Sequence, residues 1–383
     1  MRTRLAIITT LALLAAGCGS SAPSRENAAR TSSTGVAAAR ALVASLEKPV
    51  SRFQPPGPRI DARALAGKSV WYVPISISTP VFAVANNSLR EALGRAGVRL
   101  HTCSGNADPS ATAACIEQAI SSGASGIVVD AIPDALAPNA FASAASHHIP
   151  VLIVDQLPPR AGAPGAVAGH GGDALAYTLE QDTELVRDEA DVAIAQAGGK
   201  TSVLVMPFTD SPSTLAWDAA AVSQLHRLCP ECELASQKVG LANLQLVASQ
   251  TSSALLAHPD VKYVLPEFDA VLQEVQQGVQ QAGFAGRVKV ITAAGDLAGL
   301  QAIRSGRLQA DIGQDFPYEG FADADEIMRM MLKEPIVEEH VPIRLFDAHD
   351  IAGLPLTVAA EDSGQWYGSN AYIGMFERLW GLR

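Results

Sequence analysis

Short apolar runs alternate with amphipathic segments of helical length between Lys68 and Asp155. This alternation predicts strands that pair in parallel through right-handed helical crossovers. Both faces of such a sheet are covered, which agrees with the uninterrupted apolar character of runs such as Val151-Leu-Ile-Val154. The expected strands are residues 69–76, 98–103, 126–130 and 151–155, and the expected helices are residues 84–96, 109–122 and 134–148.

The same rhythm resumes after Glu180 and predicts a second unit of this kind, similar in pattern but not in sequence. Gly198-Gly199 ends its first helix, and apolar residues of its last helix recur at helical spacing. The expected helices are residues 184–197, 213–228, 243–257, 270–282, 297–305 and 317–333, and the expected strands are residues 202–206, 234–239, 262–266, 288–293, 309–313 and 341–345.

Three segments lie outside this alternation. Residues 36–47 are expected to form a helix, and a proline-rich connector follows it. Residues 156–178 are rich in glycine and proline and are expected to form a loop beside a cleft. Within that loop, Gly169-His-Gly-Gly172 lacks the accompanying nucleophile or lysine of an oxyanion hole or phosphate loop. Residues 365–372 carry few charges and are expected to fold back onto the second unit.

Polar residues gather where the strands of the first unit end, namely Ser76, Thr79, Asp130 and Asp155. Ligands of open α/β sheets bind beyond the carboxyl ends of the strands, so these residues predict a ligand site. A structural interpretation is also open, because Asp130 and Asp155 are suited to cap the helices that follow them.

Length and charge restrict the class of protein. The chain has 383 residues, of which 48% are hydrophobic, and this predicts two domains with large cores. Its 39 acidic residues exceed its 28 basic residues and give a formal net charge of -11. Because this charge repels phosphate backbones, we expect no nucleic-acid partner.

The N-terminus has the features of an export signal. Arg2 and Arg4 precede an apolar run at residues 5–16, which is shorter than a membrane span. Ala15-Ala-Gly-Cys18 resembles a bacterial lipobox, in which the cysteine becomes the lipidated first residue, although leucine is commoner at the position of Ala15. Cys18 is therefore the expected lipidation site, and residues 19–30 are expected to form a tether. An ordinary signal peptide with an incidental cysteine is the alternative.

Four cysteines remain after Cys18, an even number that favours disulfides in an exported chain. Proximity in sequence favours pairing Cys103 with Cys115 and Cys229 with Cys232. Metal binding by the second pair is less favoured, because no second pair of zinc ligands follows nearby. We therefore expect no metal.

Several local motifs together resemble the sugar-type periplasmic binding proteins, which are the ribose-binding-like (type I) solute receptors of ABC importers. These motifs are Ser76-Ile-Ser-Thr-Pro-Val-Phe82, Gly126-Ile-Val-Val-Asp130, Ile149-Pro-Val-Leu-Ile-Val-Asp155, His258-Pro-Asp-Val261 and Gly313-Gln314. No single motif is decisive, but their order and spacing from about Lys68 to about Leu345 carry the resemblance.

The resemblance implies an α/β fold of two doubly wound, Rossmann-like lobes joined by three crossings, near Asp182, Asp315 and Ile343. A monomer of this kind captures a small molecule between its lobes, without cofactor or catalysis, and delivers it to an ABC permease outside the cytoplasm. The implied division is a signal peptide at residues 1–17, a lipid-anchored tether and helix at 18–67, an N-terminal lobe at 68–181 with 316–342, and a C-terminal lobe at 182–315 with 343–383.

The resemblance also implies a pocket that contains Ser76, Phe82, Asp130, Asp155 and Gln314. Four positions depart from the polar residues expected there. Gln156 replaces an arginine, Trp217 lies near the position of a second arginine, Phe268 replaces an asparagine and Ala294 replaces an aspartate.

These departures predict a more apolar wall, to which Phe208, Phe316 and Trp366 also contribute. The expected ligand is therefore less hydroxylated than a free hexose, or carries an aromatic or aliphatic part. Two alternatives remain open. Glu267 and Asp269, beside Phe268, could supply the polar contacts to the ligand, and Trp217 could pack within its helix layer without contacting the ligand.

The chain lacks the motifs that are typical of several other classes of protein. The chain has no G-x-S-x-G or H-E-x-x-H of a hydrolase, and Ser76-Ile-Ser-Thr-Pro80 stands where a dehydrogenase has its glycine-rich turn. The export signal occupies the place of a regulator's DNA-binding domain. A receptor that passes its ligand-bound state to a membrane signalling protein remains an alternative to transport.

Overall fold

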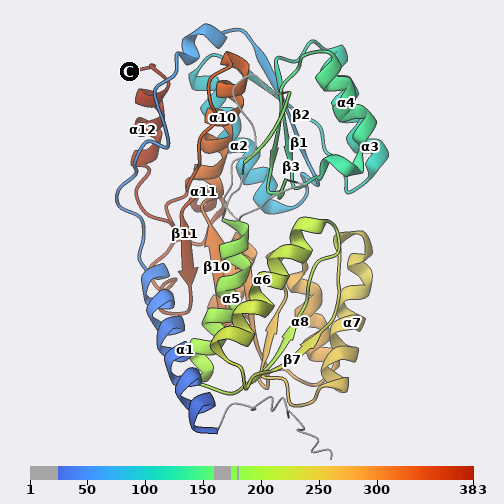
Figure 1. Ribbon diagram of the computed structural model, residues 1–383, viewed down its shortest axis with the longest axis vertical. Helices are drawn as coiled ribbons and strands as arrows, with labels where there is room; N and C mark the ends of the chain where they lie inside the picture. The colour runs from blue at the N-terminus through green and yellow to red at the C-terminus, as the bar shows by residue number, and fades with distance from the viewer. Residues whose placement is uncertain (1–24, 159–173, 179–180) are drawn as a thin grey trace, which may run out of the picture.

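The computed structural model describes residues 25–158, 174–178 and 181–383, and it contains two β-sheets stacked end to end along its long axis (Figure 1). The predicted signal peptide, Cys18 and most of the predicted loop at 156–178 lie outside the described residues. Among the described residues, no helix has both the length and the apolar composition of a membrane span.

The first sheet has five parallel strands in the order β2-β1-β3-β4-β5. Alternate residues face opposite sides, so Val70 and Tyr72 enter one core and Trp71 and Val73 enter the other. Its strands are β1 (Ser69–Pro74), β2 (Arg99–Thr102), β3 (Gly126–Asp130), β4 (Val151–Val154) and β5 (Leu175–Tyr177).

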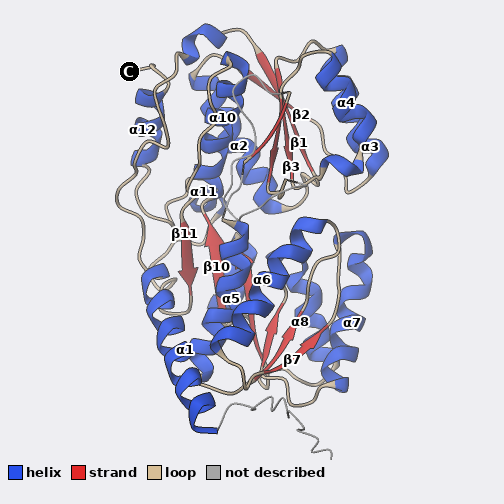
Figure 2. Cartoon of the chain, in the orientation of Figure 1, coloured by secondary structure: helices blue, strands red, loops and turns tan. Residues whose placement is uncertain are grey.

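Helices cover both faces of this sheet, as the apolar strands require (Figure 2). One face packs against α2 (Pro80–Arg95) and α10 (Phe316–Leu332), and the other packs against α3 (Pro109–Ser121) and α4 (Pro138–Ser146). We refer to the five-stranded sheet with these helices as the first lobe. Short 3-10 turns are η1 (Ala62–Leu65) and η2 (Asp134–Leu136).

The second sheet has six strands in the order β11-β10-β9-β8-β6-β7. All its pairs are parallel except that of β10 with β11. Its strands are β6 (Ser202–Val205), β7 (Glu233–Ser236), β8 (Tyr263–Leu265), β9 (Lys289–Ala294), β10 (Ala310–Gln314) and β11 (Ile343–Phe346).

The second sheet is also covered on both faces, and with its helices we call it the second lobe. Residues of α5 and α6 pack on one face, and residues of α7, α8 and α9 pack on the other. The helices and turns are α5 (Asp182–Ala197), α6 (Pro212–Leu228), η3 (Leu241–Asn243), α7 (Leu244–Ala257), η4 (Asp269–Val271), α8 (Leu272–Gln281) and α9 (Leu297–Arg304).

The predicted α/β class with two parallel-dominant sheets is confirmed. The chain passes from one sheet to the other between β5 and α5, between β10 and α10, and between α10 and β11. Both predicted disulfides are present, Cys103 with Cys115 and Cys229 with Cys232. The prediction of a loop at residues 156–178 is wrong at the C-terminal end of that range. Leu175–Tyr177 pairs with β4 and forms the edge strand β5.

The helix expected at residues 36–47 is longer than predicted, because α1 (Arg25–Leu46) begins within the predicted tether. Val36 and Ala39 are buried against α5 and α6, so this helix docks on the second lobe. Gly35 permits the approach, because a Cβ there would lie 2.1 Å from the carbonyl oxygen of Leu228.

The C-terminal tail departs from the expectation that it belongs wholly to the second lobe. Trp366 and Tyr367 pack in the second lobe, near α11 (Val358–Asp362). The following helix α12 (Ala371–Leu379) packs instead against the first lobe, because its apolar face meets α10. The stacked rings of Trp380 and Phe321 show this, with centroids 5.9 Å apart.

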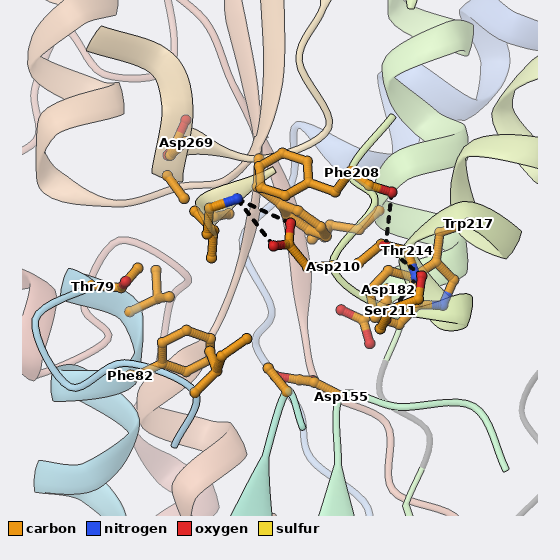
Figure 3. A pocket seen from close by; sticks show the side chains of 18 of the residues that line it. Thr79, Phe82, Asp155, Asp182, Phe208, Asp210, Ser211, Thr214, Trp217 and Asp269 are labelled. Carbon is orange, nitrogen blue, oxygen red and sulfur yellow. Dashed lines mark hydrogen bonds between the residues drawn. The ribbon is translucent and has the colours of Figure 1, made fainter. Parts of the chain in front are cut away.

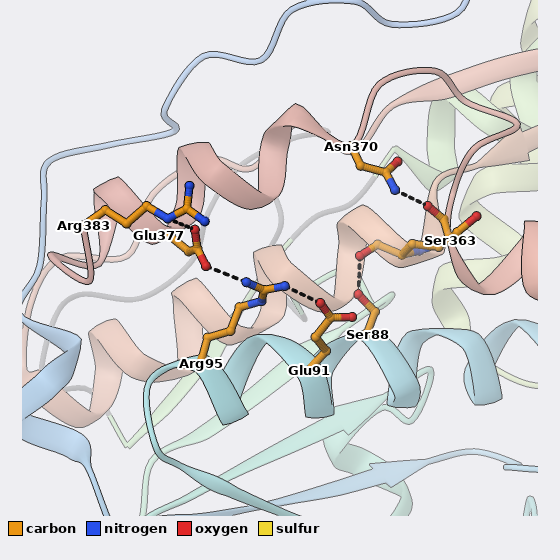
Figure 4. Close-up of polar contacts among 8 residues, drawn as sticks. Ser88, Glu91, Arg95, Ser363, Asn370, Glu377 and Arg383 are labelled. Carbon is orange, nitrogen blue, oxygen red and sulfur yellow. Dashed lines mark hydrogen bonds and ion pairs between the residues drawn. The ribbon is translucent and has the colours of Figure 1, made fainter.

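Polar contacts fix α12 to the first lobe (Figure 4). Arg95 of α2 contacts both Glu377 of α12 and Glu91, each at 2.5 Å, and Arg383 also pairs with Glu377. Deeper in the same contact, Trp380 Nε1 donates to Asp325 Oδ1 at 2.7 Å.

The connector between α1 and β1 runs along this tail. Val50 N donates to Tyr367 O at 2.8 Å beside the second lobe, and Ile60 N donates to Leu379 O at 2.9 Å beside the first lobe. Both chain ends therefore join the two lobes, in addition to the three passages between the sheets (Figure 1).

We predict that Trp380→Ala lowers the free energy of unfolding by about 3 to 5 kcal/mol, because it empties a fully buried ring site and leaves Asp325 without its indole donor. Urea unfolding measures the change. The matched control is Val358→Ala, whose side chain is 61% exposed, with an expected change within about 0.5 kcal/mol. Equal stability of the two variants would contradict a structural role for α12.

Candidate ligand-binding site

A cavity of about 100 Å³ lies between the facing carboxyl ends of the two sheets (Figure 3). Ile75, Ala131 and Asp155 line it from turns that follow strands of the first lobe. Phe208 and Phe268 line it from turns that follow strands of the second lobe. Both lobes therefore contribute to one space, as expected for ligands of open α/β sheets.

Aromatic side chains form much of the cavity wall. Phe268 contacts Phe208 edge to face at 5.7 Å between ring centroids, and Trp217 contacts Phe268 in the same manner at 6.0 Å. Phe82 approaches from the first lobe, and Phe316 begins α10 at the passage between the lobes. Trp217 thus packs in its lobe and also lines the cavity, and its role in binding stays a prediction.

The polar residues of the second lobe are held by the backbone. Asp210 accepts from Leu241 N with both carboxylate oxygens at 3.1 Å. Ser211 caps α6 by accepting from Thr214 N at 3.2 Å, and Asp296 caps α9 by accepting from Gly299 N at 2.6 Å. These bonds fix the wall while they satisfy the amide groups of the helix ends.

Gln156 joins the two lobes at the edge of the cavity. Its Nε2 donates to Asp155 O at 2.6 Å, and its Oε1 accepts from Ser213 Oγ of α6 at 2.9 Å. Ser213 Oγ in turn accepts from Leu157 N at 2.9 Å. The amide that stands in place of the expected arginine therefore bonds partners within the protein through both its nitrogen and its oxygen.

Several acidic side chains lie close together at the cavity and directly behind its wall. Burial raises the pKa of Asp155 to about 6, and contacts to Asp130 and Asp182 partly oppose this shift. Burial also raises the pKa of Asp182 well above its ordinary value, and the charge of Asp155 adds to this effect. Asp130 has a raised pKa for the same two reasons. Groups so placed share protons or need a positive partner.

Two groups of carboxylates among the described residues have the spacing of a metal site, Asp130 with Asp155 and Glu319, and Asp325 with Glu326 and Glu339. The second group already contains a cation, because Arg329 Nε donates to Asp325 Oδ2 at 2.7 Å. An acidic cluster alone does not establish a metal, and we assign none to either group.

The family model described as periplasmic binding protein domain matches residues 70–335, which is more than half of the chain. The chain belongs to this family. No curated protein matches it. The prediction of a binding protein that is not an enzyme agrees with this assignment.

Solved structures of periplasmic binding proteins share the fold. A solute-binding protein from Agrobacterium vitis bound to alpha-D-tagatopyranose has a TM-score of 0.65 at 16% identity and covers 75% of this chain and 96% of its own. The Caulobacter myo-inositol binding protein has a TM-score of 0.63 at 15% identity, with 77% and 97% covered. A glucose-galactose binding protein from Geobacillus stearothermophilus has a TM-score of 0.64 at 13% identity, with 74% and 98% covered.

Six of the nine residues predicted for the pocket of this periplasmic binding protein line the cavity, and their role in binding stays a prediction. They are Thr79, Phe82, Asp155, Gln156, Trp217 and Phe268. The wall expected from Phe208, Phe316 and Ala294 is also present, but Trp366 is not in it, because Trp366 is buried in the second-lobe core and donates to Pro355 O at 2.8 Å.

Three predicted residues do not line the cavity. Asp130 is fully buried and accepts from the hydroxyl of Tyr72. Gln314 donates to Glu319 Oε2 at 2.8 Å and lines a smaller neighbouring space. Ser76 contacts Ser78 Oγ at 2.8 Å and lines an adjoining open groove. Their positions at strand ends are as expected, but their side chains turn toward other partners.

The sequence reasoning missed several polar lining residues of the second lobe. Asp210-Ser211 and Asp296 lie directly before helices, so the ordinary signal for a helix N-cap would have found them. Asp269 was considered only as an alternative to Phe268, and both line the cavity. Asp182 was predicted as a passage between lobes and proves to be a lining residue as well.

The buried acids predict that the protein is less stable at about pH 8 than at about pH 5. Burial raises the pKa of Asp155 to about 6 and that of Asp315 to about 8, whereas an unfolded aspartate titrates near ~3.9. Between these values the folded state binds more protons, so the free energy of unfolding falls as pH rises. Calorimetric melting temperatures at the two pH values measure this.

The matched variant is Asp315→Asn, because asparagine can still accept the bond from Tyr318 N that caps α10. We expect a smaller difference in melting temperature between the two pH values than in the wild type. A wild-type protein that melts at a higher temperature at about pH 8 than at about pH 5 would contradict the conclusion that burial raises the pKa of these acids.

Proposed function

We propose that this member of the periplasmic binding protein family captures a small molecule between its two lobes and delivers it to an ABC permease. The observation that carries the proposal is the cavity at the facing strand ends, lined from both lobes. A ligand that contacts both walls stabilises the closed arrangement by its greater affinity for that arrangement. A permease can then distinguish the loaded protein from the empty one.

We propose that the two lobes move toward each other around the ligand, each as one body. The predicted boundaries divide the two bodies, except that α12 belongs with the first lobe, on which it packs. Gln156 and Ser213 lie where the halves meet beside the cavity. Hinge closure around a ligand changes the contacts at such a junction, while the two buried cores stay intact.

The proposed ligand is sugar-like in size but carries fewer hydroxyls or an apolar part. Support comes from the wall of Phe208, Trp217, Phe268 and Phe316, which offers ring faces where hydroxyls would find no partner. Proteins of the same fold bind tagatopyranose and myo-inositol. These ligands indicate the approximate size of the proposed solute but do not identify it.

The first test is a thermal-shift screen of the mature protein against sugars, polyols, nucleosides and small aromatics. A true ligand at about 100 times its dissociation constant adds about 2.7 kcal/mol to the free energy of unfolding. The indole of Trp217 lines the cavity and reports binding independently by its fluorescence. Failure of every solute class to raise the melting temperature would contradict capture of a small molecule.

Phe268→Asn tests the apolar wall in the same screen. We expect it to weaken binding of the best solute and to move the preference toward more hydroxylated ones, because the amide supplies the partner that the ring lacks. Leu246→Asn, at a side chain 46% exposed, is the control for a polar substitution. Unchanged affinity and preference in Phe268→Asn would remove the wall from the proposal.

We also propose that the mature protein is anchored outside the cytoplasm by a lipid on Cys18. The support is the run of Arg2, Arg4, a short apolar stretch and Ala15-Ala-Gly-Cys18, which lies outside the described residues. Such an anchor keeps the receptor near its permease in the membrane.

Substitution Cys18→Ser is expected to abolish incorporation of labelled fatty acid and to move the protein from the membrane fraction to the soluble fraction. Cys232→Ser, which breaks a disulfide of the second lobe instead, is the matched control and should retain the label. A labelled Cys18→Ser protein would show that the lipid is attached elsewhere or that the signal is of the ordinary type.

A further inference from the structure

The cavity is lined by acids and aromatics without a described cationic side chain. Five aspartates line it, and no lysine, arginine or histidine occurs among its described lining residues. The five are Asp155, Asp182, Asp210, Asp269 and Asp296. Low polarity around them strengthens the negative potential that an entering solute meets.

Some of these carboxylates are already engaged. Asp210 accepts from Leu241 N, and Asp296 accepts from Gly299 N. Asp182 lies beside Asp155, and burial together with the charge of Asp155 raises the pKa of Asp182, so Asp182 is the member of this pair that keeps its proton. Asp210 and Asp296 fix the shape of the site, and Asp155 and Asp269 are the acids considered for a ligand.

Asp155 and Asp269 each have an oxygen to which no amide, amine or hydroxyl group of the described residues donates. Asp155 is 7% exposed and Asp269 is 9% exposed, and Oδ1 of each is buried without such a donor, with only other carboxyl groups beside it. The other oxygen of Asp269 accepts from Asp296 N at 3.1 Å, which fixes the carboxylate in place. The two residues reach the cavity from different lobes (Figure 3). A buried acceptor of this kind needs a donor from the ligand.

Two side-chain donors near the cavity are used within the protein, and carboxylate oxygens without a donor remain among the described lining residues. Gln156 Nε2 donates to Asp155 O, and Thr214 Oγ1 lies 3.0 Å from Phe208 O and donates to it. A sugar hydroxyl both donates and accepts, so it needs donors and acceptors in its site. An ammonium group only donates, and it therefore matches a site in which acceptors remain.

The aromatic wall suits the same charge. The negative ring faces of Phe and Trp attract a cation within about 6 Å, and the attraction grows when water is excluded. Phe82, Phe208, Trp217 and Phe268 surround a space that Asp155 and Asp269 border. Recognition of amines and quaternary ammonium groups by such aromatic enclosures is well founded physically.

We propose that the solute captured here is an organic cation, an amine or quaternary ammonium compound with an aromatic or aliphatic body, held by Asp155 and Asp269 across the aromatic wall. This inference rests on the proposed function, since it names the ligand class of that cavity. Ionised carboxylates bind the cation, so binding weakens as pH falls. Asp155 is faced by Asp130 of β3, Asp182 of α5, and Glu319 and Asp323 of α10, and each adds negative charge when ionised. Asp269 is faced in the same way by Asp311 of β10 and by Asp296.

The test compares probe pairs that differ in charge but little in shape, by calorimetric titration and thermal shift of the full mature protein. The pairs are choline with dimethylbutanol, tyramine with para-ethylphenol, and glucosamine with glucose. We expect at least one cation to bind about tenfold or more tightly than its neutral partner. Binding of a permanently charged probe should weaken between about pH 7.5 and about pH 5, because Asp155 has a raised pKa.

Asp269→Asn and Asp155→Asn should each reduce the affinity for the cation about tenfold and reduce the preference over the neutral partner. Asparagine keeps an acceptor for Asp296 N, so the site should retain its shape. Asp260→Asn, at an exposed aspartate of the same lobe as Asp269, is the control and should change neither affinity nor preference. Melting temperatures without probe establish that the variants fold.

Two outcomes would overturn the inference. If a neutral sugar or polyol binds as tightly as its cationic partner, the ligand is not selected for charge, while capture of a solute still stands. If no probe, charged or neutral, binds to the folded protein, both the ligand class and the proposed capture of a solute fail.

Discussion

Burial of both faces of two parallel sheets is the constraint on which the rest of this structure depends. Residues such as Val128 and Val264 are fully buried at the centres of their sheets, and the sheet faces are mostly apolar, with Thr292 and Asp311 as buried polar exceptions. Many other polar side chains lie at the strand ends, where turns and helix N-termini begin. Because the carboxyl ends of the two sheets face each other, the acids and aromatics of both lobes meet in one cavity.

Placing so many acids at this junction reduces stability and favours specificity. Burial raises the pKa of Asp130, Asp155, Asp182 and Asp269, which means that the empty site resists carrying full charge. A partner that neutralises this charge gains the interaction that the protein lacks internally. Stability lost in forming a polar site is commonly recovered when the right ligand binds, and a poorly matched ligand leaves the groups unsatisfied.

The ends of the chain add a second connection between the lobes. Helix α1 docks on the second lobe, α12 docks on the first, and the connector lies along the tail through Val50 and Ile60. These segments lie outside the matched family region at residues 70–335. They lie where the lobes are already joined, so they reinforce that side of the molecule while the cavity stays between the facing strand ends (Figure 1).

The alternation of apolar runs and helical segments determined the fold class and the order of the elements apart from β5, because these follow from local periodicity. The short spacing of the cysteines determined the two disulfides. The family resemblance also singled out Phe82, Asp155 and Phe268, which follow β1, β4 and β8 in the chain. Only the tertiary structure decided which end residues face the cavity, because a side chain of Asp130 or Gln314 turns toward whichever partner packing brings near. It likewise decided that α12 packs on the first lobe, because the sequence of an apolar helix face does not specify which surface covers it.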